Sequence, residues 1–103
     1  MKRLPEIFQK NGYEHSVIWR DSDYCITEVK NIDTKKLYCY EAFEIQKYKE
    51  TEIKGKTIEA REATPPNEAW GEKGYTVHNL IEAQLKIGQM RSNKNQTKKN
   101  GIS

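Results

Sequence analysis

Hydrophobic and polar residues alternate along the first half of the chain with the two-residue period that is typical of antiparallel β-strands. The pattern predicts strands over residues 15–20 and 24–30, which are both rich in β-branched and aromatic side chains. Asp21-Ser22-Asp23 lies between them and predicts a turn, because such side chains accept hydrogen bonds from nearby backbone amides. The first half of the chain is therefore expected to form an antiparallel meander.

The longest predicted strand covers residues 37–48, and its two faces differ in character. Its odd positions are expected to face the core, and they hold Leu37, Cys39, Phe43 and Ile45. Its even positions hold Tyr38, Tyr40, Ala42 and Tyr48. A turn at Lys54-Gly55-Lys56 then leads into a fourth strand over residues 57–63, whose small and charged residues suit the edge of a sheet.

Two segments show helical spacing instead. Residues 4–12 predict a short N-terminal helix, with Leu4, Ile7 and Phe8 on one face and Gly12 at its end. After a loop over residues 64–74 and a short strand over residues 75–78, Asn79 and Glu82 form a capping-box pair ahead of the main helix. Its apolar stripe is expected to lie across the odd face of the longest strand.

Together these elements predict an α+β fold: a four- to five-stranded antiparallel meander with one main C-terminal helix packed on one face and a short N-terminal helix. With 103 residues the chain fits one domain, which we place at residues 1–90. Residues 91–103 are predicted to be a flexible basic tail, because such a polar segment cannot offset the entropy of ordering. Only 35% of the residues are hydrophobic, so the core is lean and a homodimer would help to bury more surface.

The charge of the chain is concentrated in that tail. The whole chain carries 18 cations and 15 acids, and the tail contributes four of the cations, Arg91, Lys94, Lys98 and Lys99, and none of the acids. The body therefore holds 14 cations against 15 acids, a net charge of about −1. The tail can attract any polyanion, but specificity has to come from the body.

The sequence also bears on location and redox state. No apolar run approaches the roughly 18 residues that span a bilayer, and we expect a cytoplasmic protein without membrane contact. Cys25 and Cys39 are expected to be buried free thiols, as is usual in that compartment. If the second and third predicted strands pair around their turn, these two cysteines would be near neighbours across the sheet.

No motif of the chain indicates catalysis. Cys25, Cys39, His15 and His78 are of the right types for zinc, but no pair has the spacing of a zinc motif. Ser16 follows His15 directly, and adjacent strand residues point to opposite faces. We therefore predict no metal, no cofactor and no enzyme activity. A pocket holding His15 or His78 beside a carboxylate would revive the enzyme alternative.

Nucleic-acid binding is the leading functional prediction. Tyrosines on the even face of the longest strand, with lysines nearby, form the mixture that stacks bases and contacts phosphates, although Glu44 and Gln46 share that face. Binding is expected to be non-specific and sensitive to salt. The candidate residues are Tyr38, Tyr40, Tyr48, Lys36, Lys47, Lys49, Arg91, Lys94, Lys98 and Lys99.

The alternative function is binding of a host protein, as an inhibitor or adaptor. Trp70 lies in a glycine-flanked loop and is of the type that anchors interfaces, although such a residue can also pin its own loop to the body. The candidate residues for this alternative are Trp70, Tyr75, Glu68 and Glu72. Trp19 lies in the middle of a predicted strand and is expected in the core.

The segments Tyr40–Ile45, Ile53–Ala60 and Pro66–Gly71 resemble small uncharacterised accessory proteins of bacteriophages and conjugative elements. The resemblance covers residues 17–85 and rests on strand and turn residues, not on a catalytic motif. It implies a non-enzymatic binding module that engages nucleic acid or host machinery, a class that includes inhibitors of host defence.

Overall fold

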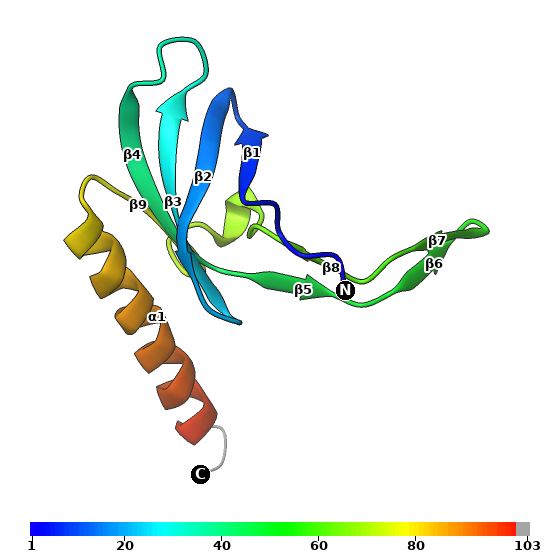
Figure 1. The fold of residues 1–103 in the computed structure, drawn as a ribbon. Coiled ribbons are helices and arrows are strands. Elements are labelled where there is room, and N and C mark those ends of the chain that lie inside the picture. The colour runs from blue at the N-terminus through cyan, green and yellow to red at the C-terminus, as the bar shows by residue number, and fades with distance from the viewer. Residues whose placement is uncertain (101–103) are drawn as a thin grey trace.

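The structure is a computed structural model that describes the backbone of residues 1–100 and the side chains of residues 1–94. A five-stranded antiparallel sheet has the order β1-β2-β3-β4-β9, and one long helix, α1, lies against it (Figure 1). The elements of this part are β1 (Ile7–Lys10), β2 (Tyr13–Arg20), β3 (Tyr24–Asn31), β4 (Leu37–Glu44), β9 (Gly74–Val77) and α1 (Leu80–Asn100). The α+β class and the antiparallel sheet are thus confirmed.

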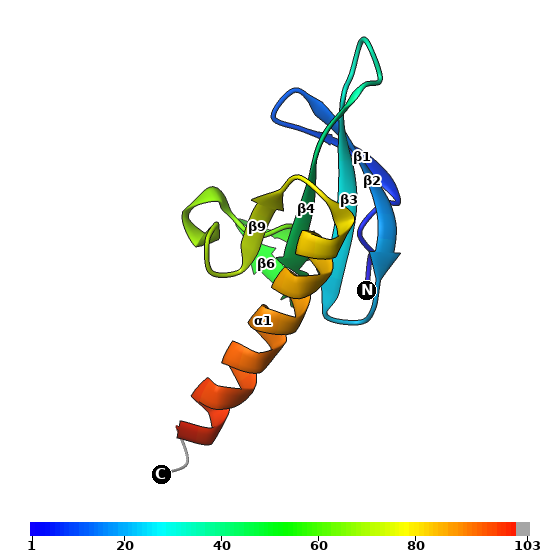
Figure 2. The same cartoon turned by 90° about the vertical axis from the view of Figure 1, so that its left-hand side faces the viewer.

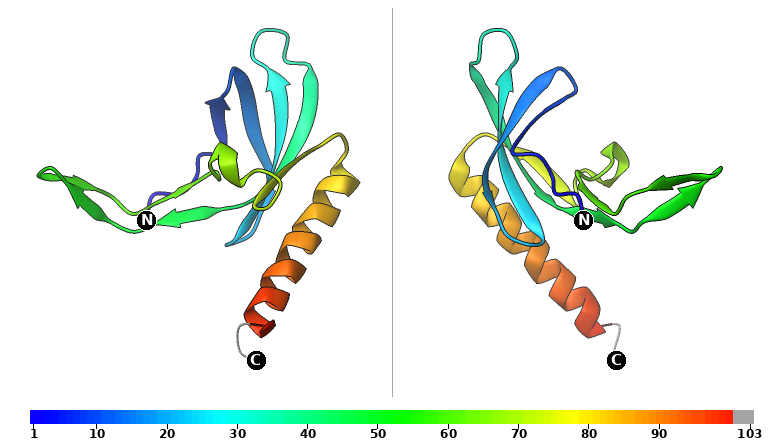
Figure 3. Two further views of the ribbon diagram at one scale, coloured as in Figure 1. Left: turned by 180° about the vertical axis from the view of Figure 1, so that it is seen from behind. Right: turned by 45° about the vertical axis from the view of Figure 1, so that its right-hand side comes forward.

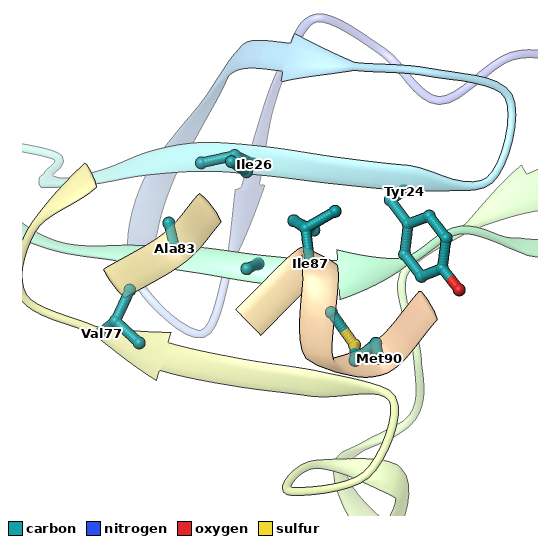
Figure 4. Close-up of a cluster of buried hydrophobic side chains, with 7 residues drawn as sticks. Tyr24, Ile26, Val77, Ala83, Ile87 and Met90 are labelled. Carbon is teal, nitrogen blue, oxygen red and sulfur yellow. The ribbon is translucent and has the colours of Figure 1, made fainter. Parts of the chain in front are cut away.

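The helix covers the even face of β4, which corrects the prediction that it covers the odd face. Ala42 and Ala83 are fully buried where α1 meets the sheet, and their small side chains let the helix approach closely. Tyr40 and Tyr75 pack against the margin of the same cluster. Its buried members are Tyr24, Ile26, Ala42, Val77, Ala83, Ile87 and Met90 (Figure 4).

The odd face of β4 is buried as well, but under a loop and the N-terminal segment. Phe43 and Ile45 form a second cluster with Cys25, and Leu4, Val17 and Trp70 pack against it. Trp70 is fixed in place, because its ring lies over Gly74 and its indole N–H donates to Thr76 Oγ1 at 3.0 Å. Both sheet faces are therefore covered where β4 ends.

The predicted N-terminal helix is wrong. Residues 7–10 form β1, an edge strand that pairs with β2 in the register Ile7↔Ser16 to Lys10↔Tyr13. Asn11 and Gly12 both have positive φ angles, 54° and 83°, and form the two-residue turn of a β-hairpin. The helical spacing of the apolar residues was therefore misleading, because the Asn-Gly turn returns the chain as a second strand.

The predicted strand over residues 37–48 is interrupted at Ile45, and the chain continues into a hairpin arm over residues 46–63 that stands away from the sheet (Figure 3). The arm has two separate ladders, Gln46↔Ala63 to Tyr48↔Arg61 and Thr51↔Ile58 to Ile53↔Lys56, whose registers agree across the unpaired residues 49–50 and 59–60. Its strands are β5 (Gln46–Tyr48), β6 (Thr51–Ile53), β7 (Lys56–Ile58) and β8 (Arg61–Ala63). The predicted fourth strand is thus split into β7 and β8, while the turn at Lys54-Gly55 is confirmed by their positive φ angles.

The start of α1 is confirmed, and its backbone runs further than the prediction. Glu82 N–H donates to Asn79 Oδ1 at 2.8 Å, and His78 N–H donates to Glu82 Oε2 at 3.5 Å. The helix passes Arg91 and ends at Asn100, projecting beyond the sheet (Figure 2). Flexibility of residues 91–103 stays a prediction, and the side chains of Lys98 and Lys99 lie outside the described residues.

The two cysteines are both buried, but they are not neighbours. Cys25 lies opposite Phe43, whereas Cys39 lies opposite Val29, four positions away along β3. Burial raises the pKa of the Cys25 thiol to about 12 and that of the Cys39 thiol to about 11. The thiols are therefore protonated near neutral pH and poor nucleophiles.

Candidate functional site

The predicted tyrosine face does not exist as one surface. Tyr40 packs against the cluster beneath α1. Tyr38 is exposed and stacks on Tyr13, with ring centroids 5.0 Å apart. Tyr48 belongs to the arm, where the Arg61 guanidinium lies 5.0 Å from its ring centroid. Because β4 ends before Tyr48 and Tyr40 packs against the cluster beneath α1, the three rings do not lie on one strand face, and their binding of nucleic acid stays a prediction.

The arm is held at its base by a half-buried ion pair. Arg20 donates two hydrogen bonds to Glu62, at 2.7 Å to Oε1 and 2.9 Å to Oε2. Leu4 N–H also donates to Glu62 Oε1, at 2.9 Å. These donors, the Arg20 guanidinium foremost, lower the pKa of the Glu62 carboxyl to about 2. The base of the arm is thereby tied to β2 and to the N-terminal segment.

Three further contacts strengthen this base. Lys2 N–H donates to Ala60 O at 2.9 Å, and Glu62 N–H donates to Lys2 O at 2.8 Å, so the N-terminal segment pairs with the edge of β8. Lys47 Nζ lies 3.0 Å from Asp23 Oδ1 in the turn between β2 and β3. The distal part, β6 and β7, is exposed at every residue.

The side chains of the arm are sorted by charge. Successive residues of a strand point to opposite faces, and the single register keeps this alternation along the whole arm. One face carries Lys47, Lys49, Ile53, Lys56 and Ile58, and at its base also Glu62, which lies opposite Lys47. The other face carries Tyr48, Glu50, Glu52, Glu59 and Arg61. We call the first of these the lysine face of the arm, and Lys54 lies at its tip.

A β-bulge in β2 decides which residues reach the arm. Val17 lies opposite Thr27 and Trp19 opposite Ile26, so Ile18 is the extra residue of the bulge. After the bulge Arg20 lies opposite Cys25, on the face that carries Glu62, whereas Trp19 lies on the face of α1. Trp19 is exposed, so its expected place in the core is wrong.

An apolar groove opens between β2 and α1. Its volume is about 570 Å³, and its lining consists of Ile18, Trp19, Ile26, Leu80, Gln84, Ile87, Gly88 and Arg91. Arg91 is the charged residue of this lining, and it is paired with Asp21 and lies over the ring of Tyr24. The groove therefore offers an apolar partner a large contact area and offers a polyanion little positive charge.

The residues predicted to bind a host protein differ in exposure, with Trp70 and Tyr75 half-buried. Trp70 is held by Gly74 and Thr76, and Lys10 Nζ lies 4.9 Å from its ring centroid. Lys86 Nζ lies 4.6 Å from the ring centroid of Tyr75. Glu68 and Glu72 are exposed on the same loop. These contacts agree with the reading of Trp70 as the residue that pins its loop.

The remaining predicted cations are spread over the molecule. Lys36 is exposed in the turn before β4, and Lys49 is exposed on the arm. Lys94 Nζ lies 3.0 Å from Glu44 Oε1, which fastens α1 to the end of β4. The tail cations whose side chains are described thus hold the helix to the body through ion pairs.

The buried imidazole of His15 lies beside the carboxylate of Glu41. A histidine beside a carboxylate is the arrangement that would support the enzyme alternative. His15 Nδ1 is 3.6 Å from Glu41 Oε1, and His15 Nε2–H donates to Lys10 O at 3.3 Å. Burial lowers the pKa of His15 and raises that of Glu41. Phe8 stacks on the imidazole with ring centroids 5.1 Å apart. The pair is enclosed within the sheet, and the absence of enzyme activity stays a prediction.

Within residues 1–94, no group of three or more His, Cys, Asp or Glu side chains converges on a point that could hold a metal ion. Nor does any helix in the described part of the chain have the length and apolar character to cross a membrane. Comparisons with protein-family models, with curated proteins and with solved structures give no match to this chain.

Replacing Glu62 by glutamine removes the charge that pairs with Arg20 at the base of the arm. We expect Glu62→Gln to lower the free energy of unfolding by about 2 kcal/mol at neutral pH. In the wild type the Arg20–Glu62 pair stabilises the fold fully above pH 4.5, the ordinary pKa of a glutamate carboxyl. This stabilisation is lost as the pH falls through the lowered pKa of Glu62, about 2. Urea denaturation at several pH values measures it, with Glu59→Gln as an exposed control. Equal stability of the two variants would contradict the anchor.

The buried histidine predicts a second dependence on pH. Because the pKa of His15 is lowered from 6.5, the unfolded chain binds a proton more readily than the folded one. The free energy of unfolding should therefore fall as the pH drops below about 6.5. His15→Phe keeps the stacking with Phe8 and should remove this slope, while the exposed control His78→Gln should retain it. The free energy of unfolding is measured by chemical denaturation at several pH values. If wild type and His15→Phe show the same dependence on pH, His15 is not its source.

Proposed function

We propose that this chain binds double-stranded DNA through the lysine face of its hairpin arm. The observation that carries the proposal is the sorting of charge beyond the base of the arm, with lysines and isoleucines on one face and Glu50, Glu52 and Glu59 on the other. The sequence predicts nucleic-acid binding through the tyrosines of the sheet. We propose instead that the binding surface is on the arm, where Lys47 and Lys49 lie.

The lysines at the distal part of the arm are available for phosphates. In the described part of the chain, Lys49, Lys54 and Lys56 make no ion pair with a carboxylate, and all three are exposed. Glu50, Glu52 and Glu59 point to the other face of the arm. Glu62 shares the lysine face at its base but is paired with Arg20, so these acids do not cancel the positive charge of the distal lysines. The lysine face is therefore a cationic strip on a body of near-zero net charge.

The shape of the arm selects the form of nucleic acid. The major groove of B-form DNA is about 12 Å wide and admits a two-stranded β-ribbon, whereas the major groove of double-stranded RNA is too narrow for side chains to read. Ile53 and Ile58 lie on the lysine face and would contact thymine methyl groups at the groove floor. The proposed ligand is thus a DNA duplex.

The number of lysines sets the strength of binding. Three or four phosphate contacts give a slope of log affinity against log salt of about −3, with a dissociation constant of roughly 10⁻⁴ to 10⁻⁶ M at physiological salt. Such binding is salt-sensitive and has little sequence preference. It needs no catalytic group. Binding of a host protein through Trp70 and its neighbours stays a prediction, as does the resemblance to accessory proteins of phages.

Removing two lysines of the arm should weaken DNA binding selectively. We expect Lys49→Ala with Lys56→Ala to reduce affinity for a labelled duplex about tenfold at low salt, and to make the salt slope about 1.8 less steep. Fluorescence anisotropy over a range of salt concentrations measures both quantities.

The matched control is Lys36→Ala with Lys73→Ala, which removes the same charge from exposed positions outside the arm. Its affinity should stay within about twofold of wild type. Equal weakening by the two double variants would mean that net charge alone drives binding. Tighter binding to single-stranded DNA or to an RNA duplex of the same length would exclude groove recognition by the arm.

A further inference from the structure

A second surface, separate from the arm, leaves large apolar side chains exposed on α1 and β2. The exposed fractions are 41% for Ile18, Trp19 and Leu80, 70% for Ile81 and 67% for Leu85. We call these five residues the α1–β2 surface. Ile18, Trp19 and Leu80 line the groove between the helix and the bulge of β2, whereas Ile81 and Leu85 lie on the exposed side of α1 next to Leu80 in sequence. DNA binding by the arm makes no use of it.

The size of this surface indicates a protein contact. Its exposed apolar area is on the order of 500 Å², near the upper end for the largest patch of a soluble monomer. If two copies bury it against each other, about 1,000 Å² is removed from water, which is near the lower limit for a specific interface. The expected association is therefore weak, with a dissociation constant in the micromolar range.

We propose that the α1–β2 surface binds a second copy of the same chain, with the two α1 helices crossing antiparallel about a two-fold axis. Such a contact requires a surface that complements itself. This one has both parts, since Ile81 and Leu85 project from the helix and the groove beside Trp19 can receive them. The ridge of each copy enters the groove of the other.

Gly88 lies in the second half of the contact, three residues before Arg91. It lines the groove, and a Cβ placed on it would meet no atom within 4 Å. The backbone of α1 is therefore accessible there, and a second helix can approach it closely. Leu80 and Arg91 lie about 16 Å apart along the helix axis, so the contact spans about three turns with Gly88 within them.

The dipole of α1 favours the antiparallel arrangement. A parallel crossing would align the two helix dipoles, whereas an antiparallel crossing opposes them. Arg91 and Lys94 are already paired with Asp21 and Glu44 of their own copy, so the dipole and not these side chains decides the direction.

A two-fold dimer would carry two arms, one from each copy. Binding of both arms to one duplex would make the second contact intramolecular and raise the overall affinity without any new contact. This consequence rests on the proposed function, whereas the dimer itself does not.

Sedimentation equilibrium of the full chain over a range of concentrations tests the dimer directly. We expect reversible dimerisation in the micromolar range for wild type, and a dissociation constant at least tenfold higher for Leu85→Glu. Ile7→Glu is the matched control, because Ile7 is 64% exposed on the edge strand β1, outside the surface, and it should dimerise as wild type does. A wild-type chain that stays monomeric at several hundred micromolar would overturn the proposal, as would equal effects of the two variants.

Cross-linking gives a second readout that does not depend on affinity. Since Cys25 and Cys39 are buried, a cysteine introduced at an exposed position is the reactive thiol. Under mild oxidation Gly88→Cys should form a disulfide-linked dimer, while Lys73→Cys, on the loop before β9, should remain monomeric. Equal cross-linking of the two variants would show random collision and would contradict the two-fold contact. Either result is independent of DNA binding.

Discussion

The β-bulge at Ile18 is the constraint on which both candidate surfaces depend. A regular strand would continue the alternation from Val17 and place Arg20 beneath the helix and Trp19 on the opposite face. With the extra residue, Arg20 instead reaches Glu62 and anchors the arm, while Trp19 joins the groove beside α1. The extra residue Ile18 therefore places Arg20 on the side of the sheet that faces the arm and Trp19 on the side that faces the helix.

The sheet is covered on both sides, and this explains why the functional surfaces lie outside it. The helix buries the face of Ala42, and the loop of Trp70 buries the face of Phe43. The central strands therefore present few side chains to a ligand. What stays exposed is the arm, which carries charge, and the outer side of α1, which carries apolar residues. We infer that the core provides rigidity and that binding takes place at these two extensions.

Much of the fold could be predicted from the sequence, because local signals fixed it. The cap at Asn79, the turn at Lys54-Gly55 and the central strands are each encoded by neighbouring residues. A signal for the first hairpin is also present, in Asn11-Gly12, but the helical spacing of the apolar residues before it predicts a helix over the same residues. Whether a helix covers the odd or even face of β4 could not be predicted, because apolar residues occupy both faces and the choice depends on contacts distant in sequence.

The candidate site was harder to predict for the same reason. Lys47 and Lys49 were identified, but their face depends on the break at Ile45, where the chain leaves the sheet and forms the arm. No local pattern marks that break, since residues 37–48 continue the alternation of a single strand. The exposure of Trp19 depends on the bulge. No residue type in the sequence marks the position of that extra residue. Both features follow from pairing between strands, not from neighbours in sequence.

The central claim is that the arm, and not the sheet, contacts DNA. Titration of the isotopically labelled protein with a short duplex, followed by backbone amide resonances, tests it most directly. The account predicts shifts concentrated at Lys49 and at residues 51–58, with Tyr38 and Lys36 unchanged. Shifts concentrated at Tyr38 and Lys36, with the arm unaffected, would contradict it.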